Sequence, residues 1–149
     1  MRGRDITISV NKKVRFNYEI LDTYIAGIVL TGTEIKSIRD KKANINESYC
    51  YFKDNELYVK QMHIAKYKFG NIYNHDEYNV RKLLLNRREI LKIQNKMDIG
   101  ISIIPLELFI NEKGFAKLEI GIARGKKLYD KRRTIKEREL KRKLRNYSF

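Results

Sequence analysis

The sequence has no tryptophan, one proline, one cysteine and two histidines among its 149 residues. The lone cysteine, Cys50, excludes an internal disulfide, and Cys50, His63 and His75 lack the spacing of a zinc motif. No apolar run approaches the roughly 18 residues of a membrane-spanning helix, and residues 6–10 are too few for the core of a signal peptide. We therefore expect a soluble, cytoplasmic protein with no bound metal, no cofactor and no membrane contact. We also expect a monomer.

Signatures of catalysis are also scarce. The pair Gly125-Lys126 resembles the end of a phosphate-binding loop, but no glycine stands five residues earlier and no Ser or Thr follows. A metal-dependent nuclease could use His75, Asp76 and Glu77, because carboxylates bind Mg²⁺ and a histidine can move a proton. Three polar residues in a loop more often form a turn. We therefore predict that the protein is not an enzyme.

Positive charge, by contrast, is abundant. The chain has 33 Lys or Arg and 18 Asp or Glu, a formal net charge of +15 and a pI near 9.9. Ten tyrosines and six phenylalanines accompany this charge. Cations hold phosphates and aromatic rings stack on unpaired bases, so the composition indicates a nucleic-acid partner. For any single tyrosine, packing on a strand is the more ordinary role.

The last 25 residues form a basic tail, 125–149, with eleven Lys or Arg and three acids, hence +8 of the net charge. The tail has too few apolar side chains to fold alone. Acid-first pairs such as Glu137 and Lys141 favour a helix, but an isolated helix of this length is marginal in water. We expect a folded domain at residues 1–124 and a tail that is disordered when free and helical when docked. A solvated tail with only loose RNA affinity is the alternative.

Alternating side chains predict most of the strands. Residues 14–20 alternate apolar with polar, as a strand with one buried face does. Residues 24–30 are apolar on both faces, which predicts a second strand deep in the sheet. Residues 49–53 and 56–62 are rich in β-favouring side chains, and the intervening Asp54-Asn55 predicts a tight hairpin.

A capping box predicts the first helix. The Thr31 hydroxyl and the Glu34 carboxylate can each accept a hydrogen bond from the other residue's backbone N–H. The helix should continue to about residue 39, with Ile35 and Ile38 on a narrow buried edge.

The region after residue 80 allows two interpretations. A single helix over residues 81–93 would point Leu85 away from the apolar stripe. Asn86, with an acid three residues later, offers an N-cap instead. We therefore predict an extended segment at residues 82–85 and a helix at residues 86–96.

The remaining segments complete a mainly β pattern. Residues 99–110 form a long predicted strand whose alternation changes phase near Pro105, as at a bulge or barrel corner. Residues 111–114 turn the chain into a last strand around residues 118–122, and residues 65–79 lack periodicity, which predicts a surface loop. About six strands and two or three short helices predict an OB-like antiparallel β-barrel with a basic C-terminal tail.

A series of short motifs runs from Asn11 to the end of the chain. They are Asn11-Lys12, AGIVLTGTE at residues 26–34, Lys36-Ser37 with Arg39, Asn44 with Ser48-Tyr49, Asn74-His75-Asp76, RKLLL at residues 81–85, Gly125-Lys126-Lys127 and Asp130-Lys131-Arg132. In residues and in order, this series closely resembles the SmpB family, the SsrA-binding proteins of bacterial trans-translation.

The resemblance implies an OB-fold barrel that binds the tRNA-like domain of transfer-messenger RNA, the tag-encoding RNA that rescues ribosomes stalled on broken messages. Protein and RNA together would mimic a tRNA, and elongation factor Tu would be reached indirectly through the RNA. The tail would enter the decoding centre and the empty message channel of the small ribosomal subunit. It would thereby sense that message is missing.

The resemblance also assigns two sets of residues. The set that faces the tRNA-like domain, or supports that face, is Asn11, Lys12, Glu34, Lys36, Arg39, Lys82 and Leu84. The decoding-centre set is Gly125, Lys126, Lys127, Tyr129, Asp130, Lys131 and Arg132. Capping for Glu34 and core packing for Leu84 are the structural alternatives.

Two positions depart from the family pattern. Ile25 stands where an acid is usual, so a polar contact expected there is absent or made elsewhere. Tyr129 stands where several relatives have His, so a protonated ring cannot be essential. A basic OB protein bound to ribosomal RNA is the second hypothesis, but such a protein needs charge without the fixed order of residues seen in this tail.

Overall fold

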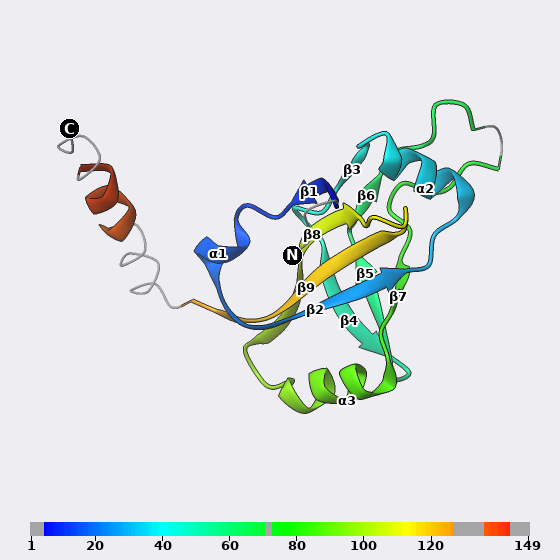
Figure 1. The fold of residues 1–149 in the computed structure, drawn as a ribbon. Coiled ribbons are helices and arrows are strands. Elements are labelled where there is room, and N and C mark those ends of the chain that lie inside the picture. The colour runs from blue at the N-terminus through cyan, green and yellow to red at the C-terminus, as the bar shows by residue number, and fades with distance from the viewer. Residues whose placement is uncertain (1–4, 71–72, 127–135, 144–149) are drawn as a thin grey trace.

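The structure is a computed structural model that describes residues 5–70, 73–126 and 136–143. Strands dominate the described residues, and the helices are short (Figure 1). The elements in chain order are β1 (Ile6–Val10), α1 (Val14–Asn17), β2 (Tyr18–Ile28), α2 (Gly32–Arg39), β3 (Ala43–Asn44), β4 (Tyr49–Lys53), β5 (Glu56–Lys60), β6 (His63–Ile64), β7 (Arg81–Leu84), α3 (Arg87–Lys96), β8 (Ile101–Ile110) and β9 (Ala116–Gly125). Residues 136–143 are also helical.

The main sheet closes on itself. Its strands follow the order β1-β8-β4-β5-β7-β2-β9, and β8 also pairs with β9, so six strands from β8 to β9 form a ring. The strand pairs of this sheet are antiparallel, and β1 pairs with the half of β8 that β4 leaves free. The predicted mainly β, antiparallel barrel is confirmed. The two-residue strands β3 and β6 form a separate small sheet.

The start of β2 corrects the sequence prediction. Residues 14–20 are not one strand, because Val14–Asn17 is the helical turn α1, in which the backbone N–H groups of Phe16 and Asn17 both donate to Lys13 O. Val14 is buried against the barrel. Four residues are too few to distinguish a helical period from a strand period, and packing of Val14 decides between them.

From Tyr18 the strand is longer than predicted. The two predicted strands are one, β2, because a register shift between Ile20 and Asp22 lets pairing with β9 continue past the polar Asp22-Thr23. The sequence pattern also failed to predict β1, a five-residue edge strand whose end residues Ile6 and Val10 are exposed. Such a short, half-exposed strand carries little alternation to detect.

Local signals predicted the caps and turns correctly. Both capping boxes are present, Thr31 with Glu34 in α2 and Asn86 with Glu89 in α3. The hairpin between β4 and β5 turns at Asp54-Asn55, with φ of 51° and 64°, as a type I′ turn requires. β7 covers residues 81–84, so the extended alternative for this region is confirmed. A register shift between Pro105 and Glu107 in β8 is the bulge expected near Pro105.

Aliphatic side chains fill the barrel, and α2 and α3 lie at its two ends (Figure 1). Ile38 of α2 and Ile93 of α3 are fully buried in the same cluster as the strand residues. Each such side chain stabilises the fold by about 1.5–3 kcal/mol. The largest fully buried side chains are Phe109, Ile38, Ile45, Leu57, Met62, Ile64, Leu83, Ile93, Ile103, Leu108, Leu118 and Ile120.

Polar contacts hold α3 against the strands. Lys96 pairs with Asp22 of β2 and lies 3.1 Å from the Tyr24 hydroxyl, and Gln94 Nε2 donates to Asn55 Oδ1 in the β4–β5 turn at 3.3 Å. The Lys96 ammonium beside Asp22 lowers the pKa of Asp22, and Asp22 in turn raises the pKa of Lys96. In the part of the chain that the structure describes, no helix is long and apolar enough to cross a bilayer.

Candidate nucleic-acid interface

A buried ion pair lies beneath α2. The Arg81 and Glu34 side chains are 2% and 4% exposed, and Arg81 Nε donates to Glu34 Oε2. The other carboxylate oxygen, Glu34 Oε1, accepts from the Thr31 backbone N–H at 2.9 Å. Both oxygens of Glu34 are therefore occupied within the protein, so Glu34 supports the surface from below.

Arg81 also fixes the end of the 65–79 loop. Nη1 donates to Met62 O at 2.6 Å and to Asn79 O at 3.1 Å. Nη2 donates to Asp76 O and Glu77 O, each at 3.3 Å. One guanidinium thus satisfies four carbonyl oxygens and one carboxylate, which connects α2, β7 and the loop.

His75 is a structural residue of the same loop. It is buried, and its Nε2 lies 2.9 Å from Ile64 O, which as a carbonyl can only accept. His75 Nε2 therefore carries the proton, and Nδ1 accepts from the Thr33 hydroxyl at 2.9 Å. Both ring nitrogens are used, which leaves His75 without a free nitrogen for metal or proton transfer. Over the described residues, no group of three or more His, Cys, Asp or Glu could hold a metal ion.

Arg39 and Leu84 meet at a groove of about 360 Å³, which we call the α2 groove. Leu84 is 50% exposed, and Arg39 Nη2 donates to Gly114 O at 3.3 Å. A Cβ on Gly27 would lie 3.3 Å from Leu84 Cβ, so a glycine keeps the floor open. The residues that line the groove are Gly27, Ile28, Leu30, Ile35, Arg39, Leu84, Gly114, Phe115, Ala116 and Lys117.

Two residues that line the α2 groove were not predicted from the sequence. Lys117 lines it as a second cation, and Phe115 lines it with 62% of its surface exposed. Neither belongs to a motif that pointed to RNA, because Phe115 lies in the turn before β9 and Lys117 lies in the ordinary alternation of that strand. Only the register of β9 against β2, which pairs Lys117 with Gly27, brings Lys117 to the groove.

Lys36 and Lys82 lie on the two elements, α2 and β7, that carry Arg39 and Leu84. Lys36 is exposed on α2, one turn before Arg39, and its Nζ lies 5.5 Å from the centroid of the Tyr67 ring. Lys82 and Leu84 are two residues apart in β7 and share its outward face, while Arg81 and Leu83 point inward. Of the predicted residues on α2 and β7, the structure therefore brings Arg39 and Leu84 together in the groove, while Lys36 and Lys82 lie on the same two elements outside its lining.

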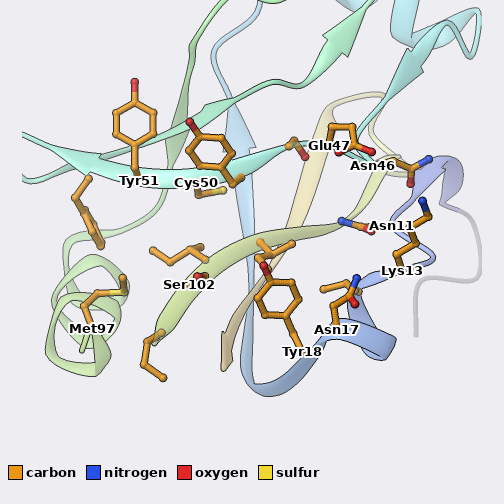
Figure 2. Close-up of a pocket in the computed structure, with 17 residues that line it drawn as sticks. Asn11, Lys13, Asn17, Tyr18, Asn46, Glu47, Cys50, Tyr51, Met97 and Ser102 are labelled. Atoms are coloured by element: carbon orange, nitrogen blue, oxygen red, sulfur yellow. The ribbon is translucent and has the colours of Figure 1, made fainter. Parts of the chain in front are cut away.

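Asn11 and Lys12 lie elsewhere. Asn11 lines a second hollow of about 760 Å³ that shares no lining residue with the α2 groove. In Figure 2, Asn11 lies near Lys13, Asn17 and Asn46. Its backbone N–H donates to Leu106 O, and its Nδ2 donates to Pro105 O at 3.2 Å. Lys12 is exposed. The predicted set thus divides between two regions of the barrel.

The decoding-centre set begins on the barrel. Gly125 ends β9 opposite Tyr18, and the Lys126 N–H donates to Asn17 O at 2.9 Å. The barrel therefore extends slightly past the predicted boundary at residue 124. The other five members, Lys127, Tyr129, Asp130, Lys131 and Arg132, lie outside the described residues.

Ile25 is 47% exposed and pairs in register with Glu119 of β9, so an acid stands beside the position where the family usually has one. In the helical residues 136–143, the Arg138 guanidinium lies 5.5 Å from the centroid of the Phe16 ring in α1.

Comparison with known proteins agrees with this barrel and its motifs. The SmpB protein family model matches residues 8–148. The SsrA-binding protein of Christiangramia forsetii is 56% identical over 135 residues, 90% of this chain and 86% of that protein. The SsrA-binding protein of Pseudothermotoga lettingae is 47% identical over 141 residues, 94% of this chain and 95% of its own length.

A solved structure is similar as well. A chain of the structure described as "tmRNA-SmpB: a journey to the center of the bacterial ribosome" is 43% identical and superposes with a TM-score of 0.66 over 80% of this chain and 84% of that chain. Because similarity of sequence and fold extends over most of its length, the chain belongs to the SmpB family.

Proposed function

We propose that the protein is an RNA-binding adaptor without catalytic activity, which binds transfer-messenger RNA and delivers it to stalled ribosomes for trans-translation. Membership of the SmpB family and the names of its relatives support this function. The observation that carries it is the α2 groove, which Arg39, Lys117 and Leu84 line above the buried Glu34–Arg81 pair, with Lys36 and Lys82 on the same helix and strand as Arg39 and Leu84.

The α2 groove suits a folded RNA with unpaired nucleotides. Arg39 and Lys36 supply positive charge one helical turn apart, which matches phosphates along a strand. The exposed Leu84 offers an apolar surface to a base or sugar. The Glu34–Arg81 pair beneath holds α2 and β7 in a fixed relation, so the groove is formed before RNA arrives. On this proposal, Glu34 is a positioning residue, Asn11 contacts RNA from the second hollow, and the neighbouring exposed Lys12 contacts it beside that hollow.

The tail binds the ribosome rather than transfer-messenger RNA. Gly125 and Lys126 lead it away from the barrel, and the residues Lys127, Tyr129, Asp130, Lys131 and Arg132 enter the decoding centre. Message and tail then compete for the same channel of the small subunit, so the tail docks only where message is missing. On this proposal the protein acts in the cytoplasm as a monomer without metal or cofactor, and elongation factor Tu joins through the RNA.

Recovery of RNA with the protein from its native cell tests the proposal. Transfer-messenger RNA should copurify, and bulk ribosomal RNA alone would favour a general rRNA-binding protein instead. Arg39→Gln should weaken binding of the tRNA-like domain and reduce the slope of log K against log salt by about 0.7–0.9, the value for one phosphate contact. Lys92→Gln on α3, which removes the same charge from an exposed site, is the matched control. Equal behaviour of the two variants would contradict the groove assignment.

A further inference from the structure

Three tyrosines form a continuous row on the outer face of the β4–β5 hairpin. Tyr51 and Tyr58 are register partners, with ring centroids 6.0 Å apart and planes inclined by 28°. The Tyr49 and Tyr51 centroids are 6.5 Å apart. Figure 2 shows Tyr51 on the side of β4 that faces away from Ser102 of β8. We call Tyr49, Tyr51 and Tyr58 the tyrosine row.

The barrel does not need these rings for its core. Alternation along β4 and β5 sends Cys50, Leu57 and Val59 inward, where they are buried. The tyrosines occupy the positions between them, and Tyr49 is 44% exposed. Their placement on the outer face leaves aromatic surface available to a partner.

Lysines border the row. Tyr49 is in register with Lys60, and Tyr58 is in register with Lys82 of β7. Lys53 follows in β4, and like Lys60 it is exposed. Glu56 is the acid on this face, and it lies 3.7 Å from Lys82. Three cations with one acid beside aromatic rings complement a polyanion that has stacking groups.

The surface is also held rigid. The type I′ turn at Asp54-Asn55 closes the hairpin, and Gln94 of α3 donates to Asn55 at 3.3 Å. A surface that does not have to be ordered on binding loses less entropy when a ligand docks.

We infer that the tyrosine row, with Lys53 and Lys60, binds unpaired RNA nucleotides, the bases on the rings and the phosphates on the lysines. This inference extends the proposed RNA-binding function by a second contact. Lys82 and Leu84 share the outward face of β7, the strand between β5 and β2, so the row lies on the same side of the sheet as the α2 groove. An RNA strand that leaves the groove can therefore continue onto the row.

The direct test uses the full chain and an unstructured oligouridine that contains 4-thiouridine. Photocrosslinking followed by mass spectrometry should identify Tyr49, Tyr51 or Tyr58. Tyr51→Val keeps a β-favouring residue but removes the ring, and should weaken oligouridine binding roughly fivefold to a hundredfold, the range for loss of one base–ring stack. Tyr51→Phe should bind like the unmodified protein, because stacking does not need the hydroxyl.

A second variant keeps the test decisive if Tyr51→Val misfolds. Lys53→Gln with Lys60→Gln changes only exposed side chains, and should reduce the salt slope for single-stranded RNA by about 1.4, the value for two phosphate contacts. Lys92→Gln with Lys113→Gln removes the same charge from other exposed positions and should reduce the salt slope by less. Equal slopes for the two double variants, with crosslinks confined to the tail, would overturn the inference.

The source of the nucleotides is decided by two further measurements. If the row serves transfer-messenger RNA, Tyr51→Val weakens binding of that RNA in solution. If it serves ribosomal RNA, the same variant binds transfer-messenger RNA normally but binds isolated small subunits more weakly. Normal binding of Tyr51→Val to both transfer-messenger RNA and small subunits would overturn the inference about the tyrosine row but would leave the proposed function standing. Failure of the unmodified protein to bind transfer-messenger RNA would instead refute the proposed function.

Discussion

Glu34 of α2 and Arg81 of β7 form an ion pair that is almost completely buried. The two residues are 47 positions apart in the sequence, and each has further hydrogen bonds to the backbone, Glu34 to the N-terminus of α2 and Arg81 to the loop before β7. This pair joins the helix and the strand that carry Arg39 and Leu84. The stability of the pair and the shape of the α2 groove should therefore change together.

Glu34→Ala should lower the free energy of unfolding by about 3–5 kcal/mol, because it leaves the Arg81 charge buried without a partner. Chemical denaturation measures the loss. Lys36→Ala, on the same helix but exposed, is the control and should change stability by less than about 0.5 kcal/mol. A loss below about 1 kcal/mol for Glu34→Ala would show that Arg81 becomes solvated once its partner is removed.

Removal of the tail after Lys126 should separate binding from ribosome rescue. The deleted residues 127–149 contain ten Lys or Arg and three acids, and the cut leaves β9 and its Lys126–Asn17 hydrogen bond intact. The truncated protein should still bind the tRNA-like RNA, with a shallower salt dependence. Tagging on stalled ribosomes should be abolished. Loss of specific RNA binding by a truncated protein with normal circular dichroism would contradict this division.

Tyr129 is expected to stack on an unpaired ribosomal base, because it lies between lysines in a segment too polar to bury it. Stacking needs a flat ring and not the hydroxyl, so Tyr129→Phe and Tyr129→His should support tagging. Tyr129→Ala should impair tagging by the equivalent of about 1–3 kcal/mol. Binding to free transfer-messenger RNA should be equal in all three. A lower melting temperature for Tyr129→Ala would indicate that the ring packs on the barrel instead.

The Asp22–Lys96 pair predicts a pH dependence of stability. Because Lys96 lowers the pKa of Asp22, the stabilisation by Asp22 is complete above its unfolded pKa and is lost as pH falls through the folded pKa. The raised pKa of Lys96 has the opposite sign, so that contribution is lost only as strongly alkaline pH passes through the folded pKa. Asp22→Asn should therefore melt slightly lower than the unmodified protein at neutral pH. The difference should be small, because both side chains are 40% or more exposed, and should disappear in strong acid. A difference that persists in acid would exclude charge as its origin.

Cys50 should report on opening of the barrel between β4 and β8. The thiol is buried, and burial raises its pKa well above the usual range. A thiol reagent should therefore label Cys50 only when the protein unfolds locally, far more slowly than a free thiol. Labelling in denaturant provides the reference rate. Rapid labelling of the native protein would show that the strands separate readily at the Cys50–Ile103 pair.

Local chemistry accounts for much of the agreement between sequence and structure. A capping box such as Thr31 with Glu34 involves residues three apart, and the Asp54-Asn55 turn involves two neighbours, so both are readable without knowledge of the fold. The order of the motifs was likewise sufficient to identify the family.

Local sequence signals did not predict the short helix α1. Val14 alternates with its neighbours as a strand residue would, and only its burial beside Ile104 and Ala123 explains a helical turn there. The role of Glu34 in the site likewise depends on a residue that is distant in the sequence. Its capping role was visible in the sequence, but its pairing with Arg81 was not.

The sequence alone therefore determined the caps, the turns, the basic tail and the family, because these depend on residues close in the chain or on their order. Only the tertiary structure decided that Arg81 lies inside, that Lys117 reaches the α2 groove and that Tyr49, Tyr51 and Tyr58 stand in one row. Each of these depends on the register between strands, which is set by packing of residues far apart in the sequence.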